Sequence, residues 1–477
     1  MCECVGRAAL TRREHDVQLP DEYHQINRDM FPFRAVSPKD VRTLIDRASK
    51  EADTFVITVH DGQVTHTGGD DGPAIHRKRL DGQLDLIADV AKDIPDMRVV
   101  YSAQDTPSTI ISYDQRQELS QGVENNEYVP LARIKSDNQF TGWLASCSYN
   151  SPLRQHGYDP IPVEDIDWAE KTFIVDHLKS MDMCAHPELI PQHGLLAGLR
   201  LQRGTDPLSA KFAISKTLAH ADVLGVPTER FTEASTVSPI PWAEKNGDRL
   251  LWRGANTGIW HKERNHWRGT HRLRLMSLTN AHDGVARVIG PQVKGTVGQA
   301  TVDAPLDKLN EQHVDIAFVG EPIQCEESDG SCAEIKENYA FRGRVTPDDM
   351  DHAKYLIDVD GNAWSARFQR LMLSGSLLLK STVMPEWFSD RIQPWLHYVP
   401  VKVDYGDLYD ALVFFKGNDA LAKEIAENAR EWTEKFYRRE DMVAYAFRLY
   451  LEWARLQAED RDAASYTYDE KDELERK

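Results

Sequence analysis

The spacing of apolar residues along the first half of the chain predicts alternating strands and helices. TFVITV at residues 54–59 and MRVVYSA at residues 97–103 are short runs rich in β-branched and other apolar residues. Between them, LDLIADVAKDI at residues 84–94 carries its apolar residues at helical spacing. Strand, helix and strand in this order are typical of a βαβ unit over a parallel sheet. We therefore expect the first half to be an α/β domain.

The second half repeats this alternation and ends in a helical pattern. The runs that predict strands are RLLWRG at 249–254, DIAFVG at 315–320, KYLIDV at 354–359, SLLLKS at 376–381 and LHYVPV at 396–401. From residue 418 to about residue 460, apolar positions recur every three or four residues, which predicts a long helix with Trp432 and Phe436 in the core. The stretch 233–247, rich in proline and small residues, is the best candidate for a boundary between two α/β halves.

One of these strands leads into a turn with unusual polar chemistry. Asp360, Gly361 and Asn362 follow YLIDV, and the apolar spacing beyond them predicts a helix that starts at Ala363 and ends at Ser374-Gly375. The carboxyl ends of parallel strands are where α/β sheets bind ligands, and a helix start offers unpaired N–H groups and a positive dipole end. Ser365 and Arg367 add a hydroxyl and a cation there. The turn therefore predicts a diphosphate site.

Composition narrows the class of protein. The chain has 477 residues, 41% of them hydrophobic and 28% charged, which is typical of a globular protein of two or three domains. Its formal net charge is −19 and no basic run forms a patch, so we expect no nucleic acid partner, since binding phosphates needs clustered positive charge. No stretch approaches the roughly 20 apolar residues of a membrane span, and we expect none in this chain.

The six cysteines do not have the paired spacing of a zinc site. Cys325 and Cys332 flank EESDGS, a segment with turn chemistry. A small disulfide in an oxidising compartment and two free thiols on a loop are both compatible with this spacing.

The IDVDG segment also resembles the first motif of haloacid-dehalogenase-type phosphatases. In those enzymes one aspartate is the nucleophile and the second is an acid/base beside a magnesium ion, roles that would fall to Asp358 and Asp360. KGNDA at residues 416–420 resembles a later acidic motif of that family. However, the first motif usually opens the catalytic domain, and here more than 350 residues precede it. A magnesium-dependent phosphatase is therefore the alternative that explains less of the chain.

A longer resemblance covers the same region. The segments YLIDVDGNAWSARFQRLMLSGSLLLKS, PEWF and PWLHYVPVKVDYGDLYDALVFF are similar to the signature block of glycosyltransferase family 90. This family contains fungal capsule-associated xylosyltransferase-like proteins and animal protein O-glucosyltransferases. Upstream, RLLWRGANTG at 249–258, FAISKT at 212–217 and VVYSAQDTPS at 99–108 resemble further motifs of the family in the same order. The similarity runs from about residue 97 to residue 456 and is greatest to the fungal branch.

The resemblance implies a fold and a domain plan. The fold class is α/β with the GT-B architecture, in which two Rossmann-like domains face a cleft, followed by C-terminal helices. We expect an N-terminal extension at 1–30 and an acceptor domain at 31–240. A nucleotide-sugar-binding domain would span 241–440, and a C-terminal helix with a polar tail 441–477.

The resemblance also implies roles for individual residues. Asp105 would be the general base, and Arg253 and Arg367 would hold the diphosphate of the donor. Gly254 would belong to the donor site beside the arginine, and Gly361, Ala363 and Ser365 would line the phosphate turn. No metal is assigned to Asp358 and Asp360, because the glucosyltransferase branch lacks both.

The function implied is that of an inverting glycosyltransferase, which moves xylose or glucose from a UDP-sugar to a hydroxyl of a glycan or a protein. It would need no cofactor and no divalent metal, since arginines can neutralise the diphosphate. The family resemblance also implies the lumen of the secretory pathway, in the Golgi or endoplasmic reticulum. A non-catalytic nucleotide- or glycan-binding relative on the same fold is the remaining alternative.

Several residues have an ordinary structural interpretation beside the functional one. Without the resemblance, Asp105 reads as a turn residue and Arg253 as a salt-bridge partner. Glu386 fits either a contact to sugar hydroxyls or a helix cap. The histidines of WHKERNHWRGTH at 260–271 are spaced irregularly for ligands, which favours solvated loop residues over a metal site. His397 is expected to be a hydrogen-bonded core residue.

Overall fold

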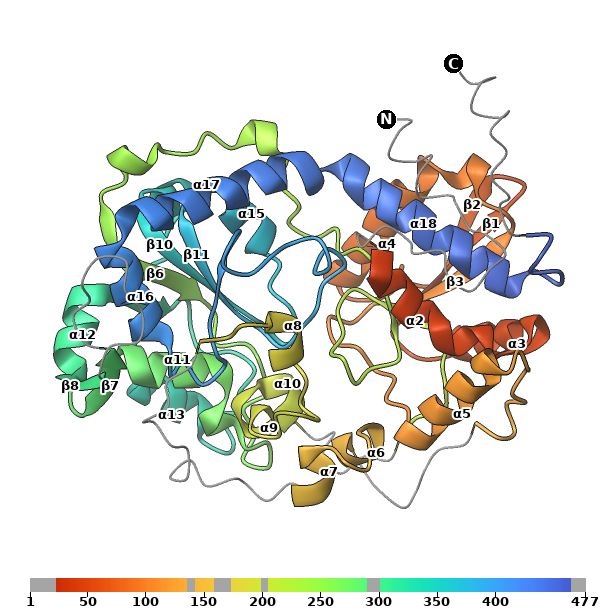
Figure 1. The fold of residues 1–477 in the computed structure, drawn as a ribbon, viewed down its shortest axis with the longest axis horizontal. Coiled ribbons are helices and arrows are strands. Elements are labelled where there is room, and N and C mark those ends of the chain that lie inside the picture. The colour runs from red at the N-terminus through yellow and green to blue at the C-terminus, as the bar shows by residue number, and fades with distance from the viewer. Residues whose placement is uncertain (1–22, 135–141, 158–172, 199–204, 290–300, 465–477) are drawn as a thin grey trace.

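The computed structural model describes residues 23–134, 142–157, 173–198, 205–289 and 301–464. Within these ranges the protein is of the mixed α/β class, with two five-stranded sheets that lie in different halves of the chain (Figure 1). The strand order is β2-β1-β3-β4-β5 in the first sheet and β12-β11-β10-β6-β9 in the second. The α/β class expected from the apolar pattern is thus confirmed.

The first sheet is only partly parallel. Its strands are β1 (Thr54–His60), β2 (Gln63–Thr67), β3 (Met97–Ser102), β4 (Lys211–Ala213) and β5 (Val223–Leu224). β1 pairs antiparallel with both β2 and β3, whereas β3, β4 and β5 run parallel. The expectation of a parallel βαβ unit from residues 54–103 is therefore wrong in its pairing.

A tight turn explains the difference. Asp61 and Gly62 both have positive φ, 48° and 70°, so β1 folds back at once into β2. β2 has alternating half-exposed and exposed residues and lacks the apolar run that identified its neighbours. Helix α4 (Ala74–Ala88) then crosses from β2 to β3, so it lies earlier than the helix expected at 84–94.

Other helices surround the first sheet. They are α2 (His24–Arg34), α3 (Pro38–Ala48) and α5 (Tyr113–Glu124). Ser37 caps α3 and Ser112 caps α5, each with its side chain accepting a backbone N–H three residues later. The loop after β3 enters α5 and carries Asp105, so its position depends on this cap.

The second sheet is parallel throughout. Its strands are β6 (Gly247–Gly254), β9 (Val314–Phe318), β10 (Ala353–Val359), β11 (Leu377–Ser381) and β12 (Val399–Pro400). All five strand predictions fall on observed strands, although β12 has only two residues. The helices of this half are α11 (His271–Thr279), α12 (Leu306–His313), α13 (Ser331–Asn338), α14 (Pro347–Asp351), α15 (Phe368–Leu373) and α16 (Leu408–Gly417). A hairpin of β7 (Val285–Ile289) and β8 (Thr301–Pro305) lies beside them.

The C-terminal helical pattern forms two helices, α17 (Asp419–Phe436) and α18 (Arg439–Gln457). Trp432 is buried as expected, but Phe436 at the end of α17 is 49% exposed, so its assignment to the core is wrong. α17 lies over the second sheet, whereas α18 returns to the first (Figure 1). There Trp453 donates to the carbonyl of Arg98 at 2.9 Å, so the end of the chain is part of the N-terminal half.

Short helices lie between β3 and β4 in the sequence, both of them strands of the first sheet. They are α6 (Trp143–Ser146), α7 (Pro152–His156), α8 (His177–Ser180), α9 (Leu189–Gln192) and α10 (Gly194–Ala197). A disulfide between Cys147 and Cys184 ties this segment together, with the Cα atoms 5.4 Å apart, and the sequence did not indicate it. Cys325 and Cys332 are also disulfide-bonded, which decides between the two alternatives left by their spacing. In the described part of the chain, every helix is too short or too polar to cross a membrane.

Candidate functional site

The turn after β10 has a different shape from the one expected. Residues 361–364 form bends, and α15 begins only at Phe368, with Arg367 at its N-cap. The N–H of Gly361 donates to the carbonyl of Trp364 at 3.1 Å, which closes the turn on itself. The expected helix start at Ala363 is therefore wrong. Because α15 has only six residues, its dipole adds little to this site.

Two of the expected turn residues face inward. Ala363 is 1% exposed and packs in an apolar cluster that includes Trp143 and Met384. Ser365 is buried, and its hydroxyl donates to Oδ1 of Asp358. Both residues therefore shape the turn from within.

Asp358 belongs to a buried charged cluster. Lys380 Nζ lies 3.2 Å from Oδ2 of Asp358 and 3.2 Å from Oε1 of Glu386. Burial lowers the pKa of Lys380, but the neighbouring carboxylates outweigh it and the net shift is upward. Burial raises the pKa of Glu386 to about 7. Glu386 is thus a buried ion-pair partner, a role that neither interpretation of the sequence anticipated.

Three of the four carboxylate oxygens of the IDVDG aspartates have protein partners, and Oδ1 of Asp360 is buried without one in the described ranges. Oδ2 of Asp360 accepts from the Thr382 hydroxyl at 2.8 Å, from the Val383 N–H at 3.1 Å and from His193 Nε2 at 3.1 Å. Both oxygens of Asp358 also have partners, as described above. In the described ranges, the three-residue group with metal-ligand spacing is instead the exposed set of His60, Asp61 and Asp96. The arrangement does not fit the nucleophile and magnesium ligand of a phosphatase.

Two stacked histidines bind Asp360, one at its carboxylate and one at its carbonyl. The rings of His193 and His271 lie 4.2 Å apart and within 8° of parallel. Each Nδ1 accepts a backbone N–H, from Leu195 and from Gly194 respectively, so each ring carries its proton on Nε2 when neutral. His193 Nε2 then donates to the Asp360 carboxylate, and His271 Nε2 to its carbonyl at 3.1 Å.

Burial, the adjacent His193 and Arg272 hold the pKa of His271 well below its usual value. The interpretation of residues 260–271 as a solvated loop is therefore wrong for His271, and also for His261, which is buried and bonds the carbonyl of Gln324. His397, by contrast, is buried and accepts the N–H of Gln393 at 2.9 Å, as expected of a core histidine.

Asp105 lies in the loop that follows β3. Its side chain is half-buried, and Oδ2 accepts a hydrogen bond from Asn362 Nδ2 at 3.3 Å. Asn362 belongs to the turn after β10 and also accepts the N–H of Gly258 at 3.0 Å. The structure thus brings together the end of β3, the loop after β6 and the turn after β10.

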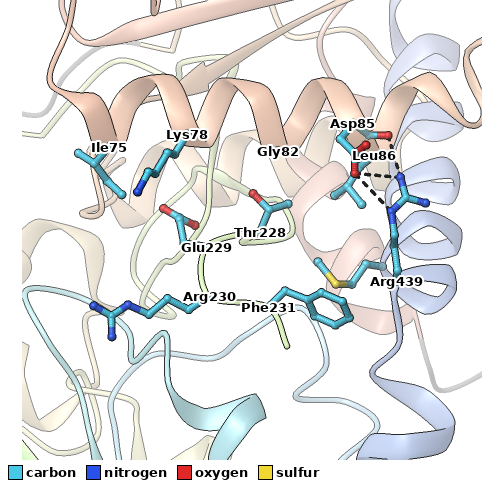
Figure 2. Close-up of a pocket in the computed structure, with 11 residues that line it drawn as sticks. Ile75, Lys78, Gly82, Asp85, Leu86, Thr228, Glu229, Arg230, Phe231 and Arg439 are labelled. Carbon is cyan, nitrogen blue, oxygen red and sulfur yellow. Dashed lines mark hydrogen bonds and ion pairs between the residues drawn. The ribbon is translucent and has the colours of Figure 1, made fainter. Parts of the chain in front are cut away.

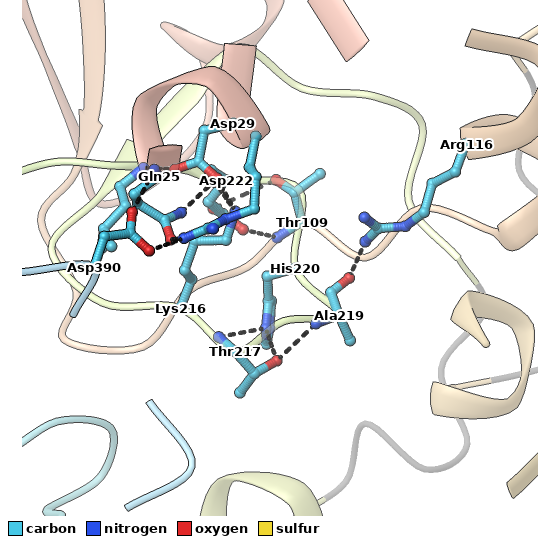
Figure 3. Close-up of polar contacts among 12 residues, drawn as sticks. Gln25, Asp29, Thr109, Arg116, Lys216, Thr217, Ala219, His220, Asp222 and Asp390 are labelled. Atoms are coloured by element: carbon cyan, nitrogen blue, oxygen red, sulfur yellow. Dashed lines mark hydrogen bonds and ion pairs between the residues drawn. The ribbon is translucent and has the colours of Figure 1, made fainter. Parts of the chain in front are cut away.

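A buried polar network positions the Asp105 loop (Figure 3). The Ser215 hydroxyl donates to the carbonyl of Asp105 at 2.6 Å, and Asp222 accepts the N–H of Thr109 at 2.8 Å. Lys216 Nζ bridges the carbonyl of Asp222 at 2.8 Å and the carboxylate of Asp29 at 2.6 Å. The serine and lysine of FAISKT therefore support this loop. Asp222 and Asp29 carry no sequence signal that marks them.

Arg253 makes the salt bridge that its sequence context allowed. Its guanidinium donates to the Asp315 carboxylate at 2.8 Å and to the Asp315 carbonyl at 2.7 Å. Its own carbonyl accepts from Arg367 at 2.6 Å. Gly254 follows, and a Cβ there would lie 2.5 Å from the Trp252 ring, so a larger residue does not fit.

Arg367 and Arg272 form the positive side of the site. Their guanidinium carbons lie 5.5 Å and 5.4 Å from the centroid of the buried Trp252 ring. Arg272 donates to the carbonyls of Asp360 and Ala255, whereas the NH2 group of Arg367 has no hydrogen-bond partner in the described ranges. Burial, followed by the charge of Arg367, lowers the pKa of Arg272 to about 9. Two clustered guanidinium groups with a free donor suit an anion.

Comparisons with known proteins agree with this picture. Residues 325–466 match the family described as glycosyl transferase family 90. Protein O-glucosyltransferase 1 of Rattus norvegicus is 38% identical over 111 residues, which cover 22% of this chain and 28% of that protein. O-glucosyltransferase rumi of Drosophila pseudoobscura pseudoobscura is 35% identical over 140 residues, 28% of this chain and 34% of that protein.

A viral relative extends the similarity. Uncharacterized protein 035R of Invertebrate iridescent virus 3 is 27% identical over 205 residues, 41% of this chain. The chain aligns with about a third of the length of the rat and fly relatives, 28% and 34% respectively. Residues 325–466, which contain the turn, Arg367 and the Lys380 cluster, match glycosyl transferase family 90.

Proposed function

We propose that the protein is an inverting glycosyltransferase that moves a sugar, xylose or glucose, from a UDP-sugar to a hydroxyl of a glycan or a protein. The observation that carries this proposal is the hydrogen bond from Asn362 to Asp105. It joins the expected base to the expected donor turn across 257 residues of sequence. The family match over residues 325–466 and the two O-glucosyltransferase relatives support the same chemistry.

In this mechanism the reaction is one displacement at the anomeric carbon. The acceptor oxygen forms a bond to that carbon while the bond from the carbon to the diphosphate oxygen breaks. The Asp105 carboxylate takes the acceptor proton, a general-base contribution of about 10²–10⁴-fold. UDP leaves with the electron pair of the broken bond, and the configuration at the carbon inverts.

The arginines stabilise the charge that develops on the diphosphate. Arg367 has a free NH2 group, and Arg272 lies on the same Trp252 ring. Arg253 contributes by accepting a hydrogen bond from Arg367, since its own guanidinium is bound to Asp315. Guanidinium groups fixed in a partly dry site neutralise a leaving group without a divalent cation. We therefore propose a metal-independent reaction.

Gly254, Gly361, Ala363 and Ser365 shape the donor site in this proposal. Gly254 lets the chain pass close to Trp252, and Gly361 closes the turn through its N–H. The GT-B architecture belongs to the same proposal, with β3 of the first sheet carrying the base loop and β10 of the second the donor turn. The domains are 31–240 and 241–440, with 1–30 as an extension and 441–477 as the C-terminal helix and tail.

We also propose the secretory pathway as the compartment. The disulfides Cys147–Cys184 and Cys325–Cys332 support it, because stable disulfides are typical of oxidising compartments. The names of the O-glucosyltransferase relatives carry no statement of compartment, so this part rests on the family resemblance and the disulfides.

The test is release of UDP from UDP-xylose and UDP-glucose, together with UDP affinity by calorimetry. UDP release with one of these donors supports the proposal. UDP binding without any release indicates a non-catalytic relative. Magnesium-dependent phosphate release from a phosphomonoester indicates the phosphatase, which the partners of Asp358 and Asp360 already disfavour.

A further inference from the structure

One hollow in the structure has a lining that includes neither Asp105 nor Asn362. It has a volume of about 460 Å³ and is formed by α4, residues 228–231 and the start of α18 (Figure 2). Its volume is within the range of about 300–1,000 Å³ that is typical of small-molecule sites. We call it the linker pocket, because residues 228–231 lie on the segment that joins the two halves.

The linker pocket combines an apolar surface with groups that can form hydrogen bonds. Phe231 and Met442 supply the apolar surface, and Lys78, Thr228 and Glu229 supply polar groups (Figure 2). One face of a sugar ring carries C–H groups that pack on an aromatic side chain, and its hydroxyls both donate and accept hydrogen bonds. The lining therefore matches the chemistry of a saccharide.

Glu229 gives this pocket an unsatisfied acceptor. Its side chain is only 9% exposed, and Oε1 is bound by Arg79. Oε2 is buried and has no hydrogen-bond partner in the described ranges. A buried acceptor without a donor is destabilising, so a ligand hydroxyl that donates to the Glu229 carboxylate would stabilise the site. A carboxylate or phosphate ligand would instead meet the negative charge of Glu229.

The pocket is connected to both parts of the candidate active site. Arg79, which binds Glu229, also donates to the carbonyl of Ala103 at 2.5 Å, two residues before Asp105. On the other side, Thr232 exchanges two hydrogen bonds with Gln369, at 2.7 Å and 3.2 Å, two residues after Arg367. A ligand in the pocket would therefore contact the segment that links the base loop to the donor turn.

The backbone of this segment is held in an uncommon conformation. Arg230 has a φ of 59°, in the left-handed region that side chains other than glycine, asparagine and aspartate rarely adopt. Such conformations persist where surrounding contacts fix them, and they are frequent at ligand sites. In the described ranges, Lys78 and Arg230 form no ion pair, so both cations remain available as hydrogen-bond donors at the rim of the pocket.

We propose that the linker pocket binds an uncharged sugar residue, with its C–H face on Phe231 and its hydroxyls bonded to the polar groups of Thr228 and Glu229. The choice of a saccharide over another hydroxylated ligand rests on the proposed glycosyltransferase function. In that setting the sugar belongs to the acceptor glycan. The pocket binds a sugar unit of this glycan other than the one that receives the transferred sugar.

The test is saturation-transfer NMR of the full chain with xylotriose, maltotriose and mannotriose, each with and without saturating UDP. We expect signal transfer from at least one trisaccharide, unaffected by UDP. Phe231→Ala should weaken that affinity about five- to tenfold by removing the aromatic face. Lys92→Ala, an exposed lysine outside the pocket, should leave it unchanged. Thermal melting and UDP affinity of each variant report whether it is folded.

Absence of transfer from all three trisaccharides would overturn the inference, as would equal affinity in the parent and in a folded Phe231→Ala variant. Loss of the signal on adding UDP would also overturn it, because the sugar would then lie in the donor site. The proposed function fails separately, when UDP is neither bound nor released. Saccharide binding through Phe231 in a protein that does not bind UDP would retain the pocket and reject the transferase.

Discussion

Asn362 fixes the position of the Asp105 carboxylate. Its Nδ2 donates to Oδ2 of Asp105 at 3.3 Å, while its Oδ1 accepts the N–H of Gly258 at 3.0 Å. The bond to a backbone N–H requires the amide oxygen on that side, so the NH2 group must face Asp105. The carboxylate is thereby held against the turn after β10, where the proposed mechanism needs a proton acceptor.

Asp105→Asn tests the role of this carboxylate. The variant keeps the size of the side chain but cannot take the acceptor proton. A base that touches the acceptor and not UDP acts mainly in the transition state. We expect unchanged UDP affinity and a loss of at least about a hundredfold in transfer rate, measured on the same preparation. Turnover near the parent rate would reduce Asp105 to a turn residue, and lost UDP binding would place it in the donor site.

Asn362→Asp should change the pH dependence of the reaction. The new carboxylate would keep one oxygen toward the Gly258 N–H and place the other beside Asp105. A like charge beside the Asp105 carboxylate disfavours its ionised form. Because the reaction needs ionised Asp105, activity on the acid side of the pH profile should be lost at a higher pH than in the parent.

Asn362→Ala is the matched control for this change. It removes the hydrogen bond without adding charge. The acid side of its pH–activity profile should therefore shift less than that of Asn362→Asp. Identical pH–activity profiles on the acid side in the two variants would mean that a charge at position 362 does not affect the titrating group.

Arg367→Ala should abolish measurable UDP binding in calorimetry. Arg367 has an NH2 group without a partner, and it lies beside the turn that the reaction is proposed to use. Removing a guanidinium that contacts phosphate typically costs about 2–5 kcal/mol. Arg268→Ala is the control, since Arg268 is half exposed and bound to Glu334. UDP affinity that survives in Arg367→Ala would remove this arginine from the donor site.

The strands could be predicted where burial on both faces produces continuous apolar runs. β3, β10 and β11 are of this kind, with nearly every residue buried. β2 was missed because it is an edge strand with exposed alternate residues, and its turn, Asp61-Gly62, was the signal available for a hairpin. The antiparallel pairing of β1 with β3 follows from that hairpin. Missing this one turn therefore made the predicted topology of the sheet wrong.

The residues of the candidate site were harder to predict from the sequence than the strands. Asp105, Arg253 and Arg367 were identified through family resemblance, because each also has an ordinary structural interpretation. His193 and Arg272 were missed, since tertiary folding alone brings them to Asp360 and no local spacing marks them. The expected helix at Ala363 failed because the turn closes through Gly361 and Trp364 and Ser365 binds Asp358 instead.

The two disulfides should contribute unequally to stability. Cys147 and Cys184 close a loop with a sequence separation of 37, whereas Cys325 and Cys332 close one of 7. In the chain-entropy description, these loops correspond to about 4 and about 2 kcal/mol. We expect the Cys147→Ser/Cys184→Ser variant to unfold at lower denaturant than Cys325→Ser/Cys332→Ser. The reverse order in urea titrations would show that loop entropy does not govern these bonds.

Glu386 should make the stability of the protein depend on pH. Burial raises its pKa from an ordinary value of 4.5 to about 7 in the folded protein, so the folded state binds more protons than the unfolded state between these values. The contribution of Glu386 to the free energy of unfolding is then fully present below about pH 4.5, and it is lost as the pH rises through about 7. The maximum change that this shift allows is about 3 kcal/mol.

Glu386→Gln removes the titrating group while keeping its size, and Lys380 retains Asp358 as a partner. Asp407, whose pKa burial also raises to about 7, titrates in the same window, so the difference between variant and parent is the quantity to measure. We expect the parent to lose more unfolding free energy than Glu386→Gln between pH 5 and pH 8 in urea titrations. Equal losses would mean that the Lys380 cluster keeps Glu386 ionised throughout, and that its buried ion pair outweighs the cost of burial.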